Sequence, residues 1–317
     1  MNNKFINNTQ REKQNICSVC IATFKRPVLL RKLIQSLFDQ KNIDDIILEI
    51  IIVDNDIEKS AKKIVAEFSD QTSITVSYYK QPIPNIALTR NLTLDKSSGD
   101  YIAILDDDET ADNYWIRNLI DTILRFNADV VFGYVIPVFD SNIAQWMKQR
   151  EIYFVLMGKT GDPPLGNYTT NCMIKASNVR KLNLRFNPKY GLGGSDGVFF
   201  DLLSEYKFKF VVCREAITYE VVPKYRSKLK FIFNRDFQRG NNMVWHAIES
   251  GNNKFQKIKF FYFIRSLVAI AYYGLQSLIF LPLRRKWIFS FRGLSFNLGK
   301  LMATLNFKLR KYKTKYN

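Results

Sequence analysis

Short apolar runs alternate with segments of helical hydrophobic spacing in the first part of the chain. The apolar runs predict strands at 16–22, 47–53, 74–79 and 101–105. The segments between and after them predict helices at 28–40, 58–68, 85–95 and 113–126. Strands that alternate with helices at this spacing predict an α/β fold with a mostly parallel sheet.

The middle of the chain has a less regular pattern. We expect strands at 129–138, 170–175, 208–213 and 216–222, and an apolar helix at 198–206. A Gly/Pro-rich loop covers 158–168, and a glycine-rich loop covers 191–197. These elements extend the predicted sheet, and the two loops are candidates for segments that border a site.

Three of the predicted strands end in polar groups, at Thr23, at Asp54 and at the run Asp106, Asp107 and Asp108. Ligands of open α/β sheets bind at the carboxyl ends of strands. Neighbouring carboxylates repel one another, and this repulsion raises their pKa values unless a cation neutralises them. Mg²⁺ or Mn²⁺ held by one or two carboxylates and by phosphate oxygens is the usual solution. A solvated acidic turn is the alternative interpretation, and the apolar strand that precedes the run disfavours it.

The four cysteines are expected to be structural. Cys17 and Cys20 have the CxxC spacing, but they lie in a predicted strand, where positions i and i+3 point to opposite faces. A shared metal or a redox pair is therefore disfavoured, and Cys172 and Cys213, in other apolar runs, are expected in the core.

Five short motifs occur in an order that resembles the family 2 glycosyltransferases. They are SVCIATFKR at 18–26, IIVDN at 51–55, ALTRN at 87–91, LDDDE at 105–109 and GGSD at 193–196. The resemblance covers about residues 15–240. It implies the GT-A nucleotide-diphospho-sugar transferase fold, with a mostly parallel sheet flanked by helices.

The resemblance also implies a donor site at the strand ends. Thr23, Phe24 and Arg26 match the donor-binding turn, and Asp54 matches the aspartate that binds the nucleoside. Arg90 lies in the family's Ala-Arg-Asn element, where it contacts the diphosphate or holds the aspartates.

The acidic motifs carry the chemistry that the resemblance implies. Asp108 is the expected direct ligand of Mg²⁺ or Mn²⁺, Asp106 contacts the metal or the ribose, and Asp107 contributes to donor binding. Asp196 matches the general base, and Ser195 stands where the family usually has Glu.

Arg235 and Arg239 form part of an RDFQRG segment that is only similar to the QxxRW element of processive synthases. Both arginines are candidates for donor binding. Because no Trp follows Arg239, the segment argues against a processive polymerase.

Several of these residues also have plain structural interpretations. Asp196 is suited to cap the helix at 198–206, Asp54 to hold a turn, and Arg90 to form a surface ion pair. Arg235 and Arg239 fit a solvated basic face, and Trp115 fits either the core or an acceptor site.

The net charge of +18 lies entirely in the last part of the chain. Residues 1–223 contain equal numbers of basic and acidic residues, whereas 224–317 contain 20 Lys and Arg and only two acids, Asp236 and Glu249. The expected division is a polar tail at 1–14, a catalytic domain at 15–225 and a basic helical region at 226–317.

The basic region contains a strongly apolar run at 260–283, followed by Arg284, Arg285 and Lys286. Apolar and aromatic residues beside clustered basic residues suit a membrane interface with anionic headgroups. We expect a peripheral or re-entrant anchor rather than a full span, and a buried helix is the alternative. The first fifteen residues have no apolar signal segment, so we expect the cytoplasmic face of the inner or plasma membrane.

The function that the resemblance implies is inverting, metal-dependent transfer of a sugar. The expected donor is a nucleotide-diphosphate sugar, with a lean to UDP. The expected acceptor is a hydroxyl of a lipid-linked saccharide or another glycan, in polysaccharide or lipopolysaccharide synthesis. Three alternatives stay open: a nucleotidyltransferase on a similar fold, a basic nucleic-acid-binding protein and an inactive binding module. A nucleotidyltransferase would need a glycine-rich phosphate loop near the N-terminus, and residues 22–27 contain no glycine. A nucleic-acid-binding protein would need a basic groove, and the neutral part of the chain offers none.

Overall fold

The computed structural model describes residues 15–69, 74–154, 158–166, 168–191, 193–250 and 255–308. The expected tail at 1–14 and the basic end after residue 308 lie outside these ranges. Close contacts divide the chain into two units. The first contains residues 1–134, 157–191 and 195–218, and the second contains 135–156, 192–194 and 219–317.

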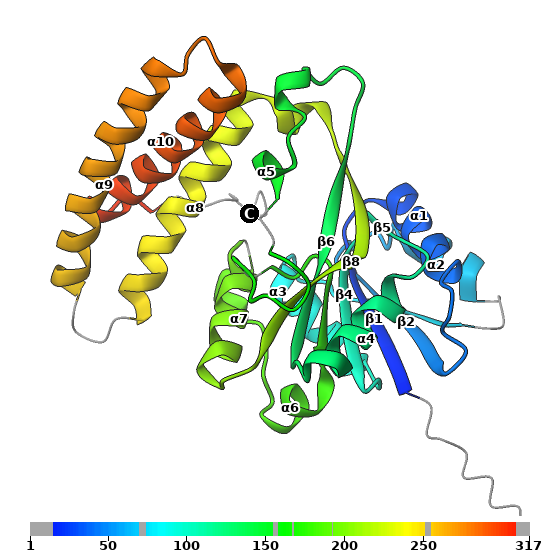
Figure 1. Ribbon diagram of the computed structural model, residues 1–317. Helices are drawn as coiled ribbons and strands as arrows, with labels where there is room; N and C mark the ends of the chain where they lie inside the picture. Colours follow the sequence, from blue (N-terminus) through cyan, green and yellow to red (C-terminus); the bar gives the residue numbers. More distant parts are fainter. Residues whose placement is uncertain are drawn as a thin grey trace, which may run out of the picture. The chain divides into compact units, whose positions relative to one another are not determined.

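The sheet of eight strands confirms the predicted α/β class (Figure 1). Its order is β3-β2-β1-β4-β7-β6-β8-β5. The strands are β1 Asn15–Thr23, β2 Ile46–Asp54, β3 Thr75–Lys80, β4 Tyr101–Asp106, β5 Glu109–Ala111, β6 Val130–Phe139, β7 Cys172–Lys175 and β8 Phe210–Val222. β1, β2, β3 and β4 pair in parallel, and β7 is antiparallel to both β4 and β6. The division between the units falls within β6 and β8.

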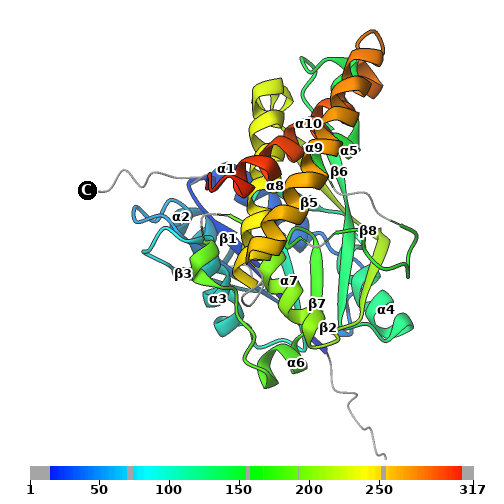
Figure 2. The same cartoon turned by 90° about the vertical axis from the view of Figure 1, so that its left-hand side faces the viewer.

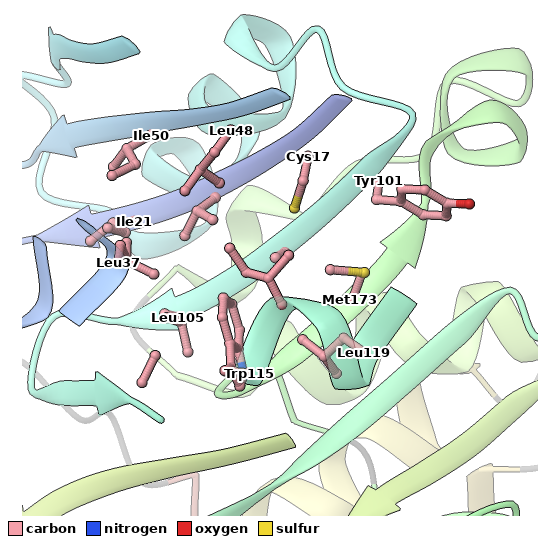
Figure 3. Close-up of a cluster of buried hydrophobic side chains, with 14 of the residues drawn as sticks. Cys17, Ile21, Leu37, Leu48, Ile50, Tyr101, Leu105, Trp115, Leu119 and Met173 are labelled. Atoms are coloured by element: carbon pink, nitrogen blue, oxygen red, sulfur yellow. The ribbon is translucent and has the colours of Figure 1, made fainter. Parts of the chain in front are cut away.

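Helices cover both faces of the parallel strands. They are α1 Pro27–Phe38, α2 Lys62–Ser69, α3 Ile86–Lys96, α4 Trp115–Phe126, α6 Ala176–Lys181 and α7 Ser195–Glu205. The short helix α5 Arg150–Tyr153 belongs to the second unit. α1, α2 and α4 pack on one face, and α3, α6 and α7 pack on the other. Figure 3 shows the first of these cores, where Trp115 and Leu119 of α4 lie near Leu105 and Met173.

The cysteines behave as predicted. Cys17 lies in the core on one face of β1, and Cys20 lies in the core on the other face. Cys172 and Cys213 are also buried, and all four are free thiols. Burial raises the pKa of the Cys20 thiol to about 12, so it stays protonated and unreactive.

Three predicted boundaries differ from the structure. α2 begins at Lys62 rather than near residue 58, because Lys59 adopts a left-handed backbone conformation (φ 56°) that no α-helix tolerates. The two strands expected at 208–213 and 216–222 are a single strand, β8. α7 begins at Ser195 rather than 198, so Asp196 lies in the first turn of the helix and not on a free loop.

Three long helices dominate the second unit: α8 Leu229–Ser250, α9 Phe255–Ile279 and α10 Arg284–Thr304 (Figure 2). α8 and α10 approach so closely at Gly240 and Gly299 that an added Cβ at either would lie 1.9 Å from a carbonyl oxygen of the facing helix. Residues of the segment 143–154 pack into the same core, which the sequence pattern does not predict.

Candidate active site

The acidic turn after β4 is held by the loop that follows β1. Ala22 of β1 is in register with Asp106 of β4, so the ends of the two parallel strands lie side by side. Thr23 Oγ1 donates to Asp107 Oδ2 at 2.8 Å. Arg26 Nη1 lies 2.9 Å from both Asp107 Oδ1 and Asp108 Oδ2. One arginine therefore neutralises two of the three consecutive carboxylates.

Arg90 joins the acidic turn to α7. Its helix, α3, begins where the Asn85 side chain accepts hydrogen bonds from the amides of Ala87 and Leu88. Arg90 Nη2 lies 3.2 Å from Asp106 Oδ1, and its Nη1 forms an ion pair with Asp196. The arginine side chain is only 8% exposed, so both carboxylates interact with a largely desolvated cation. Asp106 and Asp196, separated by 90 residues in sequence, meet at one guanidinium.

Asp196 is held in its charged form. Burial disfavours ionisation, but Arg90 and hydrogen bonds from Thr169 and Ser195 outweigh it, so the pKa of Asp196 is below its usual value. Thr169 Oγ1 donates to Asp196 Oδ2 at 2.7 Å, and Ser195 Oγ lies 3.1 Å from Oδ1. At neutral pH this side chain is a carboxylate able to accept a proton.

The pKa of Asp106 is shifted in the opposite direction. Burial raises its pKa to about 6; Arg90 opposes this shift, while Asp108, Asp196 and Asp107 add to it. The pKa of Asp107 is also raised by burial, although Arg26 and Thr23 oppose the shift. The two arginines thus leave negative charge around Asp106 that a further cation would stabilise.

The side chains around Asp106 fit a hard divalent cation. No group of three or more His, Cys, Asp or Glu side chains in the described ranges surrounds a common point. Mg²⁺ does not need such a group, because one or two carboxylates and the phosphates of a ligand complete its coordination. Asp106 and Asp108 are both oxygen donors, and the Asp106 side chain is 36% exposed. This donor set and its excess charge are compatible with Mg²⁺ or Mn²⁺.

A chain of buried polar side chains also supports the acidic turn. The Asp106 amide donates to Glu109 Oε2 at 3.0 Å, and Thr218 Oγ1 donates to Glu109 Oε1 at 2.7 Å. Asn171 donates to Thr218 and accepts a 2.7 Å hydrogen bond from the indole of Trp115. Trp115 therefore belongs to the core and does not line an acceptor site.

The carboxylate of Asp54 is directed into its own loop. It accepts hydrogen bonds from the amides of Asp56 and Ala61, each at 2.9 Å, and from Tyr78 Oη at 3.2 Å. Asp54 is fully buried, so its side chain organises the segment after β2. Binding of a nucleoside by Asp54 stays a prediction.

The structure brings together most of the residues that the motifs single out. Thr23, Arg26, Arg90 and the aspartates at 106–108 and 196 form one connected set, and the Phe24 amide lies 3.4 Å from Asp107. The Phe24 side chain is exposed.

Arg235 and Arg239 belong to the second unit, where both pair with Asp236. Their part in donor binding stays a prediction. Sequence reasoning missed Thr169, Glu109 and Thr218 as supports of the site, because single polar residues in loops and strands carry no local signal.

Comparison with known proteins places the chain in a family. The model of the family "Glycosyl transferase family 2" matches residues 18–182. The succinoglycan biosynthesis protein ExoM of Rhizobium meliloti (strain 1021) is 31% identical over 222 residues, which cover 69% of this chain and 71% of ExoM. Glycosyltransferase GlyA of Streptococcus pneumoniae is 26% identical over 118 residues, 37% of this chain and 16% of GlyA.

Solved structures agree with these matches at the level of the fold. S. aureus TarS residues 1–349, in a crystal structure with UDP-GlcNAc, superpose with a TM-score of 0.52 at 14% sequence identity. The superposition covers 88% of this chain and 90% of that one. At this identity the likeness concerns the fold, and it agrees with the GT-A-like arrangement described above. The matched family model and the ExoM similarity together show that this chain is a glycosyltransferase enzyme that belongs to glycosyl transferase family 2.

Proposed function

We propose that this enzyme transfers a sugar, with inversion, from a nucleotide-diphosphate sugar to a hydroxyl group of a glycan acceptor. The observation that carries the proposal is the Arg90 bridge, because it joins the acidic turn suited to a metal and diphosphate to Asp196. Sugar transfer needs a stabilised leaving group on one side and a general base on the other. The UDP-GlcNAc complex of TarS supports a UDP-sugar as the donor.

Each side chain has a defined task in the proposed reaction. Asp108 and Asp106 would hold a divalent metal ion, which would supply positive charge to neutralise the departing diphosphate. Arg26 and Thr23 fix the acidic turn through their contacts to Asp107. Asp196 takes the proton from the acceptor hydroxyl. The oxygen of this hydroxyl attacks the sugar carbon, and the bond between that carbon and the diphosphate breaks.

Arg90 links the donor to the base. In the unliganded protein its guanidinium lowers the pKa of Asp196 and makes that carboxylate a weak base. A diphosphate bound beside Asp106 competes for the same guanidinium, since arginine binds phosphate strongly. Its arrival raises the pKa of Asp196 toward the reaction pH, where a general base is most effective.

The acceptor is a lipid-linked saccharide in cell-envelope polysaccharide synthesis, and the enzyme acts at the cytoplasmic face of the membrane. The similarity to a succinoglycan biosynthesis protein supports the polysaccharide class. α9 supports the membrane: residues 256–279 are long and apolar enough to cross a bilayer, and only 6% of their most apolar window is buried. An exposed apolar helix followed by Arg284, Arg285 and Lys286 suits an interfacial anchor.

A donor screen with a metal control tests the proposal. Full-length protein in detergent is incubated with Mg²⁺ or Mn²⁺ and a panel of nucleotide sugars, and free nucleotide is measured. We expect release from one class of donor, loss of release in excess chelator, and loss of release in Asp108→Ala. Glu58→Ala removes an exposed carboxylate of the same unit and is expected to retain full activity. Full activity of the wild type in chelator, or no turnover with any donor and glycan acceptor, would refute the proposal.

A further inference from the structure

A large open groove lies within the second unit, between α9 and α10. Its volume is about 850 Å³, and side chains of α8, α9 and α10 line it. Cavities of this size accommodate drug-sized organic ligands. All the lining residues belong to one unit, so the groove is a property of the helices themselves.

One wall of the groove is apolar and is not covered by protein in the described part of the chain. Ile264, Val268, Ala269 and Tyr272 of α9 supply most of it, and Val268 is 66% exposed. Such a wall, continuous with an exposed apolar helix, suits a hydrocarbon chain.

The groove is also lined by cationic side chains, which come from all three helices. Arg239, Arg265, Arg292 and Lys300 line the groove together with one carboxylate, Asp236. Asp236 is already engaged: Arg292 Nε lies 2.8 Å from Oδ2, and two further arginines lie within 3.6 Å of Oδ1. Asp236 therefore neutralises arginines other than Arg265 and does not neutralise Lys300.

Arg265 of α9 and Lys300 of α10 both line the groove, and they lie close enough for their charges to interact. Neither has a carboxylate within ion-pair distance among the described residues. Lys300 donates to Asn297 Oδ1 at 3.1 Å, and both cations lie over aromatic rings. Burial lowers the pKa of Lys300, and the charge of Arg265 lowers it further. An anion placed between the two side chains would remove this repulsion.

We propose that this groove binds the diphosphate group and the adjoining hydrocarbon of a lipid carrier, with Arg265 and Lys300 as the headgroup ligands. The inference rests on the proposed function, because the carrier is the anchor of the lipid-linked acceptor. Four cations against one carboxylate suit a diphosphate with two or more charges better than the single charge of a phospholipid phosphodiester. The apolar wall beside them excludes a free inorganic anion as the best ligand.

The test is a binding titration of full-length protein in detergent with farnesyl diphosphate. Chelator is present, so that no metal ion at the acidic turn captures the probe. We expect saturable binding that is at least tenfold tighter than that of inorganic diphosphate or farnesol. The double variant Arg265→Gln, Lys300→Gln is expected to weaken farnesyl diphosphate binding at least tenfold. The matched control Lys228→Gln, Lys230→Gln removes two exposed charges of the same unit outside the groove and should bind as the wild type does.

Three results would overturn the inference: equal affinity for inorganic diphosphate, equal binding by the groove double variant, or equally tight competition by phosphatidylglycerol in the same detergent. UDP-sugar binding measured on the same preparations separates the two proposals. Donor binding without farnesyl diphosphate binding rejects the groove alone. Farnesyl diphosphate binding without binding of any nucleotide sugar rejects the proposed donor.

Discussion

At the scale of single residues, the site depends on two aspartates that share one arginine and differ in pKa. The pKa of Asp106 is raised to about 6, and the pKa of Asp196 is lowered below its usual value. Pairs of carboxylates whose environments separate their pKa values in this way mark different chemical roles. Here Asp106, with the raised pKa, belongs to the metal and donor side, and Asp196, with the lowered pKa, is the candidate base.

The raised pKa of Asp106 predicts that donor binding weakens in acid. Below about pH 6 Asp106 is protonated in the folded protein and no longer offers a charged metal ligand. We expect the affinity for a UDP-sugar in Mn²⁺ to fall up to tenfold per pH unit below that value, and Asp106→Asn to bind weakly at every pH. Calorimetric titration between pH 5 and 8 measures this. A wild-type affinity that is flat across the range would contradict the assignment.

The raised pKa of Asp106 also affects the stability of the folded protein, but this effect has the opposite pH dependence to donor binding. The pKa of Asp106 in the folded protein is above the ordinary value of 3.8 for an aspartate, so the folded state binds the proton more tightly than the unfolded state does. Its contribution to the free energy of unfolding is present below about pH 4 and is lost as the pH rises through about 6. The protein is therefore less stable when Asp106 is ionised, which is the state that binds a metal. Such a loss of stability is typical of functional sites.

Much of this residue-level picture could be predicted from local sequence, but the partnerships could not. The run at 106–108 and Asp196 are recognisable as motifs, and the strand pattern places Thr23 at the correct sheet edge. The links of Arg90 to Asp196 and of Thr169 to Asp196 span 106 and 27 residues. Such contacts depend on the packing of α3 and α7 on the sheet, for which hydrophobic periodicity gives no register.

At the scale of elements, the pattern of polar and apolar residues predicts most of the helices and strands of the first unit. Cys17 and Cys20 point to opposite cores because β1 has a period of two. The errors occur where backbone geometry overrides the pattern. The left-handed conformation of Lys59 makes α2 begin later than predicted. Gly193 and Gly194 both have positive φ, so the chain can turn there and α7 begins earlier than predicted, at Ser195.

The close approach of α8 and α10 predicts a sharp sensitivity to one methyl group. In Gly299→Ala the new Cβ would lie 1.9 Å from the carbonyl oxygen of Phe237, and a helix backbone cannot yield as a side chain does. We expect a loss of stability at the upper end of the roughly 1–3 kcal/mol typical of overpacking. Urea denaturation followed by far-UV circular dichroism measures it.

Gly274→Ala in α9 is the control for that prediction. An added Cβ there meets nothing within 4 Å, so the change should be neutral or stabilise the helix by up to about 1 kcal/mol. Equal unfolding midpoints for the two variants would show that the helices do not pack through these glycines.

At the scale of the whole molecule, charge and apolar surface are concentrated in the second unit. The net charge of +18 lies in residues 224–317, and the exposed face of α9 includes Leu275 and Leu278, which are 61% and 73% exposed. Apolar burial and basic residues near anionic lipid add to one another, with about 1 kcal/mol for each Lys or Arg close to the surface.

We therefore expect the full-length protein to pellet with liposomes that contain phosphatidylglycerol, and high salt to release it only in part. The pair of changes Leu275→Glu and Leu278→Glu should release most of it at physiological salt. Leu165→Glu, which adds a charge at an exposed leucine of the first unit, should leave sedimentation unchanged. Wild-type protein that stays in the supernatant at low salt without aggregating would favour a helix that is covered in some other way.

The most direct test of the proposed mechanism separates donor binding from chemistry in Asp196→Asn. Asparagine keeps the shape of the side chain but removes its capacity to accept a proton. We predict that the dissociation constant for the UDP-sugar in Mn²⁺ changes less than about threefold, while the turnover number falls at least about 10²-fold, the lower range for a general base. Asp201→Asn, on the same helix, should keep both values. If Asp196→Asn instead loses donor binding and turnover in equal proportion, Asp196 holds the site together through Arg90 and is not the base.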